Sequence, residues 1–211
     1  MARQTAISIN TIPIGPLGII GMPGCEELTD KIDKYLVKWR KTQAIEHAES
    51  IAFFGYQRDT YKIDISIPRF GSGEGKGVIN ETVRGYDIYI VCDVFNYSCK
   101  YNMYGMEVPM SPDDHFSDLK RVISAICSKA KRVSVIMPML YEGRQHKRSS
   151  RESLDCAMAL KELVHLGVEN IITFDAHDQR VQNAIPDKSF ENVNQVITDE
   201  NNRAVFDITV D

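Results

Sequence analysis

One stretch of the chain, residues 132–186, limits the possible folds more than any other. It begins with a continuous apolar run at 133–137, which is typical of a strand buried on both faces. A basic loop, a segment with apolar residues at helical spacing and a second apolar run at 171–174 follow in order. This alternation predicts a parallel sheet with helices on both faces. The expected fold class is α/β, an open, mostly parallel sheet flanked by helices.

Other segments add elements to this core. Helical spacing predicts helices over 26–40, 119–126 and 154–164, and period-two alternation predicts a strand over 63–67. Residues 78–83 and 87–92 are predicted to be extended, and the glycine-dense segment 71–77 is predicted to be a hairpin turn. That segment lacks the spacing of both a Walker loop and a dinucleotide loop.

The remaining segments set the expected domain boundaries. Residues 1–24 are expected to be an irregular N-terminal extension, and residues 193–211 a polar tail. Residues 93–116 show no periodicity and predict a long loop, which in a compact domain is usually functional or mobile. The α/β domain is therefore predicted to span 25–192.

Composition excludes several classes of protein. A chain of 211 residues with 43 % hydrophobic content can bury the core of one domain. A net charge of −4 and a pI near 5.8 argue against a nucleic-acid binder. The five cysteines include no Cys-x-x-Cys pair, which indicates reduced thiols. Without a predicted signal peptide or membrane span, we expect a cytoplasmic protein with no membrane partner.

The loop after the first apolar run gathers positive charge. Arg144, Lys147, Arg148 and Arg151 fall within eight residues. Guanidinium and ammonium groups suit phosphate oxygens. Cations near a helix N-terminus oppose the helix dipole, so such a cluster is unfavourable unless an anion binds. A solvated helix face is the alternative explanation.

The second apolar run ends in Asp175-Ala176-His177. Alternate residues of a strand project to one side, so this carboxylate and imidazole could converge on one ion. A carboxylate with phosphate oxygens suits Mg²⁺. A capping Asp beside a hydrogen-bonded His is the plainer explanation. Because ligands gather where parallel strands end, the two strand ends together indicate a site for a nucleotide or sugar phosphate.

Three motifs, in order, resemble the N-terminal domain of ribose-phosphate pyrophosphokinases. Residues 141–148 are similar to the family's Tyr-Ala-Arg-Gln-Asp-Arg-Lys loop, and residues 173–177 to its Thr-Leu-Asp-Leu-His strand end. Residues 69–85 are similar to Arg-Phe-Ser-Asp-Gly-Glu followed by Ile-Asn-Glu-Asn-Val-Arg-Gly. The resemblance covers roughly residues 60–190. It implies a phosphoribosyltransferase-like N-terminal domain and transfer of diphosphate from Mg-ATP to ribose 5-phosphate, giving phosphoribosyl pyrophosphate.

The resemblance also implies roles for individual residues. Arg144 and Gln145 match positions that contact ATP. His177 matches a histidine near the ATP phosphates and Mg²⁺, and Asp175 matches its neighbouring carboxylate, so this pair is the predicted metal site. The catalytic residues stay unassigned.

The segment that carries Phe70 and Glu74 matches a loop that reaches the adenine of an adjoining subunit, which implies an oligomer. The chain also departs from the family. Ser72 stands where the family has Asp, His146 replaces an Asp, and the predicted loop 93–116 is longer than usual.

Nothing after residue 192 resembles the family's second domain, so the ribose 5-phosphate side of the site is expected to be missing from this chain. Two hypotheses follow. The chain is the ATP-binding half of a synthetase, incomplete unless completed in trans as a homo-oligomer or with a full-length paralogue. Alternatively, it is a non-catalytic regulatory or partner subunit of a full-length synthetase.

Overall fold

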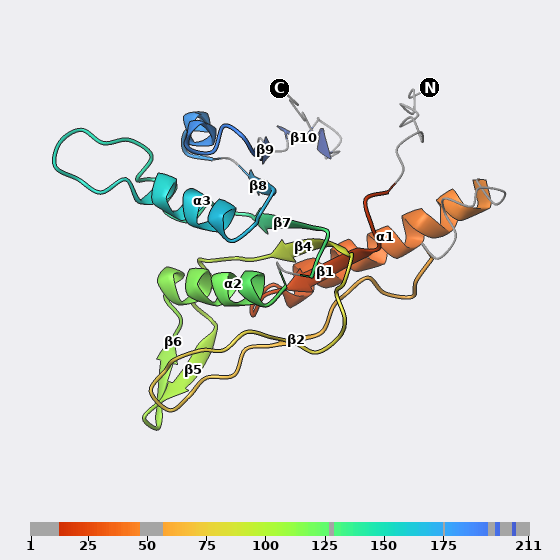
Figure 1. The fold of residues 1–211 in the computed structure, drawn as a ribbon, viewed down its shortest axis with the longest axis horizontal. Coiled ribbons are helices and arrows are strands. Elements are labelled where there is room, and N and C mark those ends of the chain that lie inside the picture. The colour runs from red at the N-terminus through yellow and green to blue at the C-terminus, as the bar shows by residue number, and fades with distance from the viewer. Residues whose placement is uncertain are drawn as a thin grey trace.

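A five-stranded parallel sheet forms the centre of the molecule (Figure 1). The computed structural model describes residues 13–46, 57–126, 129–174, 176–193, 197–198 and 204–205. The strand order is β1-β4-β7-β8-β9, and each of the four pairings is parallel. The strands are β1 (Leu17–Gly21), β4 (Asp87–Val91), β7 (Arg132–Met137), β8 (Asn170–Phe174) and β9 (Ser189–Val193). The predicted fold class is confirmed.

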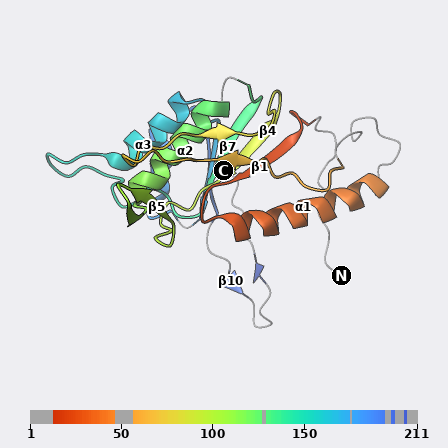
Figure 2. The same ribbon diagram turned by 90° about the horizontal axis from the view of Figure 1, so that it is seen from below.

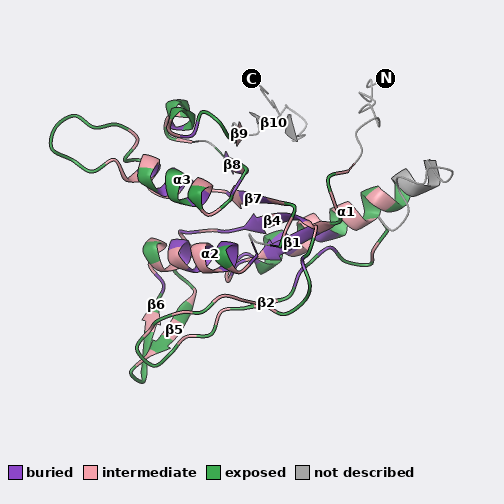
Figure 3. Ribbon diagram, in the orientation of Figure 1, coloured by how far each residue is buried: buried purple, intermediate pink, exposed green. Residues whose placement is uncertain are grey.

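Helices cover both faces of this sheet (Figure 2). Helix α1 (Glu26–Glu46) lies on one face, and α2 (Pro112–Ile126) and α3 (Asp155–His165) lie on the other. The apolar side chains of β4 alternate accordingly. Ile88 and Ile90 join the core under α2 and α3, whereas Val91 joins a smaller core under α1. Figure 3 shows the resulting burial of the strands and of the inner helix surfaces.

The helix ends follow local chemistry. In α2, Pro112 occupies the first turn, and Ser111 and Asp114 exchange hydrogen bonds between side chain and backbone at 2.9 and 3.2 Å. Beyond α3, Gly167 has a φ of 98°, the left-handed conformation expected of a glycine that follows a helix. Among the described helices, none is long and apolar enough to cross a membrane.

The glycine-dense segment forms the predicted hairpin turn. Strands β2 (Ile65–Ser66) and β3 (Val78–Ile79) pair in antiparallel fashion, and Arg69 bridges Gly75 across the turn. The extended segments predicted at 63–67 and 78–83 shrink to these two-residue strands. Beyond these strands, a side chain replaces a backbone partner, since the Asp64 amide donates to Glu81 Oε1 at 2.9 Å.

The prediction that residues 1–24 are irregular is wrong at residues 17–21, which form β1. The glycines that suggested irregularity serve close packing. A Cβ on Gly18 would lie 2.7 Å from Ile88 Cδ1, and one on Gly21 would lie 2.6 Å from Thr29 Oγ1. Both glycines therefore let neighbouring elements approach the strand.

The long loop predicted at 93–116 is also wrong. It contains strands β5 (Lys100–Met103) and β6 (Met106–Pro109), which pair as a hairpin, and the first turn of α2. Tyr104 and Gly105 form its tip with φ of 50° and 80°, and tight hairpin turns favour such positive values. In the expected polar tail, β9 ends at Val193, and β10 (Ile197–Thr198) pairs with β11 (Ala204–Val205).

The packing of α2 on the sheet gives a first prediction. Leu119 is fully buried in the larger core, so Leu119→Ala should lower the free energy of unfolding by about 2–5 kcal/mol. Met158→Ala, at an exposed position on α3, should change it by less than about 0.5 kcal/mol. Urea denaturation of both variants checks this. Equal effects would contradict the assigned core.

Candidate functional site

Two loops begin side by side because β7 pairs with β8. The register places Met137 opposite Thr173 at the carboxyl ends of these strands. The basic loop, residues 138–154, starts directly after β7, and residues 176–178 follow β8. Ligands of open parallel sheets bind at this edge. The structure therefore places the two predicted strand ends next to each other.

His146 joins the basic loop to the end of β8. Its Nε2 lies 3.2 Å from Asp178 Oδ2, and its ring centroid lies 5.1 Å from that of His177. The His146 and Asp178 side chains are only 12 % and 14 % exposed. Arg180 donates to the same carboxylate through Nε and Nη2. The middle of the basic loop is thus held over His177.

Asp178 is the fixed negative charge of this arrangement. Hydrogen bonds from the side chain and amide of Arg180 hold the pKa of Asp178 well below its ordinary value. Within the described part of the chain, His146 Nδ1 and Thr173 Oγ1 are buried polar atoms with no hydrogen-bond partner. This edge of the sheet therefore has unused hydrogen-bonding capacity.

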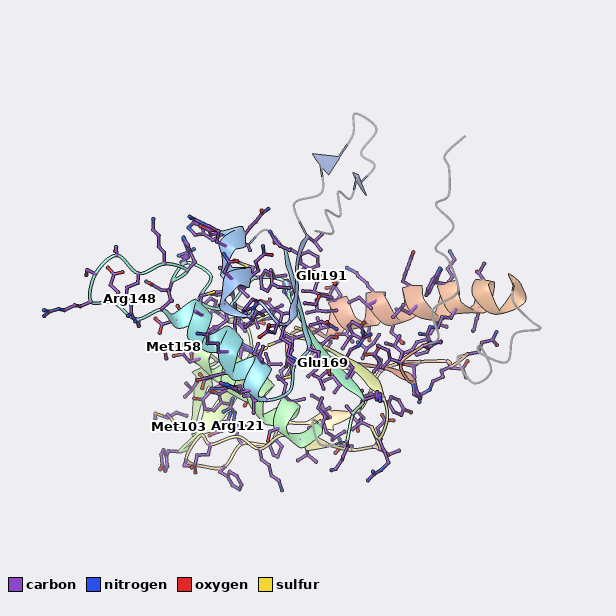
Figure 4. All side chains as sticks on the ribbon, turned by 45° about the horizontal axis from the view of Figure 1, so that its top comes forward. Met103, Arg121, Arg148, Met158, Glu169 and Glu191 are labelled. Atoms are coloured by element: carbon purple, nitrogen blue, oxygen red, sulfur yellow. The ribbon has the colours of Figure 1, made fainter. Side chains whose placement is uncertain are left out.

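The cations of the basic loop face solvent. Arg144, Lys147, Arg148 and Arg151 are exposed, and none makes an ion pair within the residues that the structure describes. Figure 4 shows Arg148 on the part of the loop that extends away from the fold. The Gln145 side chain is exposed, while its amide donates to the Glu142 carbonyl at 2.8 Å. These cationic side chains are available to bind an anion.

The start of the basic loop is fixed on α2. The Tyr141 ring stacks on Phe116 with centroids 4.3 Å apart, and its hydroxyl donates to Asp113 Oδ1 at 2.6 Å. Partial burial is the largest effect that raises the pKa of Tyr141 well above its ordinary value, and the hydrogen bond to Asp113 is the second. The phenol therefore stays neutral and keeps its donor role. The loop is anchored at Tyr141 and at His146.

Phe70 and Glu74 lie on a separate surface feature, the turn at residues 69–75. Phe70 is 58 % exposed, and the exposed Glu74 carboxylate accepts a hydrogen bond of 2.8 Å from Ser72 Oγ. In the described part of the chain, no hydrogen bond, ion pair or ring contact joins this turn to the basic loop. The structure does not bring these two groups of predicted site residues together within one chain.

The predicted metal site is described only in part. Asp175 lies outside the described residues, and His177 is exposed beside His146. No group of three or more His, Cys, Asp or Glu side chains that could hold a metal ion occurs among the residues searched, those that the structure describes. Protein-bound Mg²⁺ commonly uses one or two carboxylates together with substrate phosphates. The described donors fit such phosphates better than a bare metal ion.

Sequence reasoning missed some contacts that shape the site. Asp178 stood beside the Asp-x-His pattern, and it caps the short helix η2 (Gln179–Ala184) by accepting from the Arg180 amide. The sequence shows an acidic residue at 178 and a histidine at 146, and this pair of residue types could have suggested that the two side chains contact each other. The contact of Tyr141 with Asp113 joins residues 28 positions apart and leaves no local pattern.

The open parallel sheet, with helices on both faces and a cationic loop at its carboxyl edge, defines the chain as an α/β protein. Residues 17–167 match the N-terminal domain of ribose phosphate pyrophosphokinase. Because this match covers more than half of the chain, the protein belongs to the ribose-phosphate pyrophosphokinase family.

Curated relatives agree with this assignment. The chain is 30 % identical over 117 residues to ribose-phosphate pyrophosphokinase B of Dictyostelium discoideum, covering 55 % of this chain and 32 % of the relative. It is 28 % identical over 138 residues to ribose-phosphate pyrophosphokinase 1 of Schizosaccharomyces pombe, covering 64 % and 30 %. The chain thus spans about a third of the length of these relatives.

A solved structure supports the fold. The crystal structure of phosphoribosylpyrophosphate synthetase from Mycobacterium smegmatis matches 85 % of this chain and 48 % of its own, with a TM-score of 0.61 and 20 % identity. At this level of identity, the similarity concerns the fold alone.

The anchoring of the basic loop gives a second prediction. Asp178→Asn removes the charge that holds His146 and Arg180, so the loop should open more often. Trypsin should then cleave after residues 144–151 faster than in the wild type, by about threefold or more. Asp187→Asn, an exposed change after η2, is the matched control. Equal cleavage rates in wild type and both variants would show that Asp178 does not hold the loop.

Proposed function

We propose that this chain binds Mg-ATP at the carboxyl edge of the sheet, as the ATP side of a ribose-phosphate pyrophosphokinase. The reaction moves the β,γ-diphosphoryl group of ATP to the anomeric hydroxyl of ribose 5-phosphate. The observation that carries this proposal is the contact of His146 with Asp178 and His177. It holds the basic loop against the end of β8 and leaves the loop's cations exposed.

The proposed roles follow the positions of the side chains. Arg144 and Gln145, on the exposed surface of the loop, contact the nucleotide. His177 lies against its phosphates, and together with Asp175 it forms the proposed magnesium site. When bound, Mg²⁺ would neutralise phosphate charge. The protein's own contribution is to position the phosphates and to supply fixed positive charge, which are the main requirements of phosphoryl transfer.

The turn at residues 69–75 completes the proposed nucleotide site. Its exposed Phe70 ring and Glu74 carboxylate suit the flat face and amino edge of adenine. Because no contact joins this turn to the basic loop within the described chain, we propose that the two meet across subunits. The partner is a second copy of this chain or a full-length relative.

One observation favours a second function, a non-catalytic partner subunit that binds nucleotide. His146 stands where the family motif has an aspartate, and its imidazole is committed to Asp178. The loop therefore lacks a carboxylate that the motif supplies close to the phosphates. Such a site would retain ATP binding and lose turnover.

Binding of Mg-ATP gives the third prediction. Arg144→Ala should weaken binding by about tenfold or more, because charge-assisted hydrogen bonds to phosphate contribute about 1.5–3 kcal/mol. Arg84→Ala removes an exposed arginine that precedes β4, at the amino end of this strand and so at the sheet edge opposite the basic loop, and should leave the affinity unchanged. Isothermal titration calorimetry measures both. Equal affinities for wild type and Arg144→Ala would exclude the basic loop as the phosphate site.

A fourth prediction separates the two functions. For the catalytic function, AMP should form only when Mg²⁺ and ribose 5-phosphate are both present, either with the chain alone or with an added full-length relative whose own turnover has been inactivated. Chelation of Mg²⁺ should abolish it. Nucleotide binding without any such AMP would favour the partner-subunit function, and AMP formed without the sugar would contradict both.

A further inference from the structure

Helix α2 anchors the turn at residues 69–75 through an ion pair. Arg69 Nη2 lies 2.6 Å from Asp118 Oδ2, and these side chains are only 10 % and 2 % exposed. Burial raises the pKa of Asp118, while the charges of Arg69 and Arg121 act in the opposite direction. Removing one cation would leave a buried carboxylate undercompensated. The Arg69 side chain is therefore strongly fixed against α2.

The β5–β6 hairpin holds the same turn from the side. The Arg69 Cζ lies 4.5 Å from the Tyr101 ring centroid, in cation–π geometry. The Tyr104 amide donates to the Gly71 carbonyl at 2.9 Å. A Cβ on Gly73, whose φ is +92°, would lie 3.0 Å from Met103 Sδ. In Figure 4, Met103 and Arg121 lie on the same side of the molecule.

These contacts fix the direction of the outward side chains. Arg69 also donates to the Gly73 carbonyl at 3.0 Å, and the Phe70 amide donates to the Glu74 carbonyl at 2.8 Å. These two hydrogen bonds close the turn around the Arg69 guanidinium, which packs against α2. Phe70 and Glu74 are left on the exposed side of the turn. A change in the packing of Arg69 would alter how these two side chains are presented.

We infer that Tyr101 is a positioning residue for the base of the nucleotide, acting through Arg69 on Phe70 and Glu74. This inference rests on the proposed function, in which the turn contacts adenine. Tyr101 itself touches no ligand. It sets the affinity for the base and leaves the affinity for the phosphates, which the basic loop binds, unchanged.

The test compares two ligands, Mg-ATP and Mg-tripolyphosphate, which lacks the base. Tyr101→Ala should weaken binding of Mg-ATP by about tenfold, because it removes a partly desolvated cation–π contact. Binding of Mg-tripolyphosphate should not change. Hydrogen exchange at the Phe70 and Gly73 amides should become faster. Tyr101→Phe keeps the ring and should give wild-type values in all three measurements. Tyr97→Ala, which removes an exposed aromatic of the preceding segment, is the matched control.

Each other outcome rejects the inference. Faster exchange with unchanged Mg-ATP affinity would mean that Tyr101 shapes the turn without positioning the base. An equal loss for both ligands in Tyr101→Ala would indicate general destabilisation. If the wild type binds neither ligand, the proposed function itself fails, and the inference fails with it. Wild-type binding of both ligands, unaffected by Tyr101→Ala, would overturn the inference alone.

Discussion

The parallel pairing of β7 with β8 is the constraint on which the candidate site depends. It aligns Met137 with Thr173, so the two loops that follow these strands leave the sheet at one edge. Only then can His146, nine residues beyond β7, reach Asp178, four residues beyond β8. A sheet in which these strands were not neighbours would leave the middle of the basic loop without its contact to Asp178. The cations would then be dispersed on a mobile loop.

Helix α2 supports both surface features of the proposed nucleotide site. Its first turns hold Tyr141 through Phe116 and Asp113, and a later turn holds Arg69 through Asp118. Its opposite side is buried in the main core. Because all these contacts are made to one helix, the start of the basic loop and the turn at residues 69–75 have fixed positions relative to each other within one chain. Residues of α2 thereby set the geometry of both surface features within one chain.

The sequence predicted the parts of the structure that depend on periodicity. The apolar runs of β4, β7 and β8 and the stripes of α1 and α3 formed the expected elements, and the glycine turn formed the expected hairpin. Strand β1 was missed because its glycines serve packing against Ile88 and Thr29. The β5–β6 hairpin was missed because its turn uses Tyr104 at positive φ. The contacts of Asp118 with Arg69 and of Asp178 with His146 join distant segments and have no local pattern.

The central claim is that phosphates of Mg-ATP bind where the loops after β7 and β8 meet. The most direct measurement is a titration of the isotopically labelled chain with Mg-ATP, followed by amide chemical shifts. The claim predicts the largest shifts at residues 144–148 and 176–178, with none at Arg84 near the opposite edge of the sheet. Shifts confined to other surfaces, or no shifts at saturating nucleotide, would contradict it.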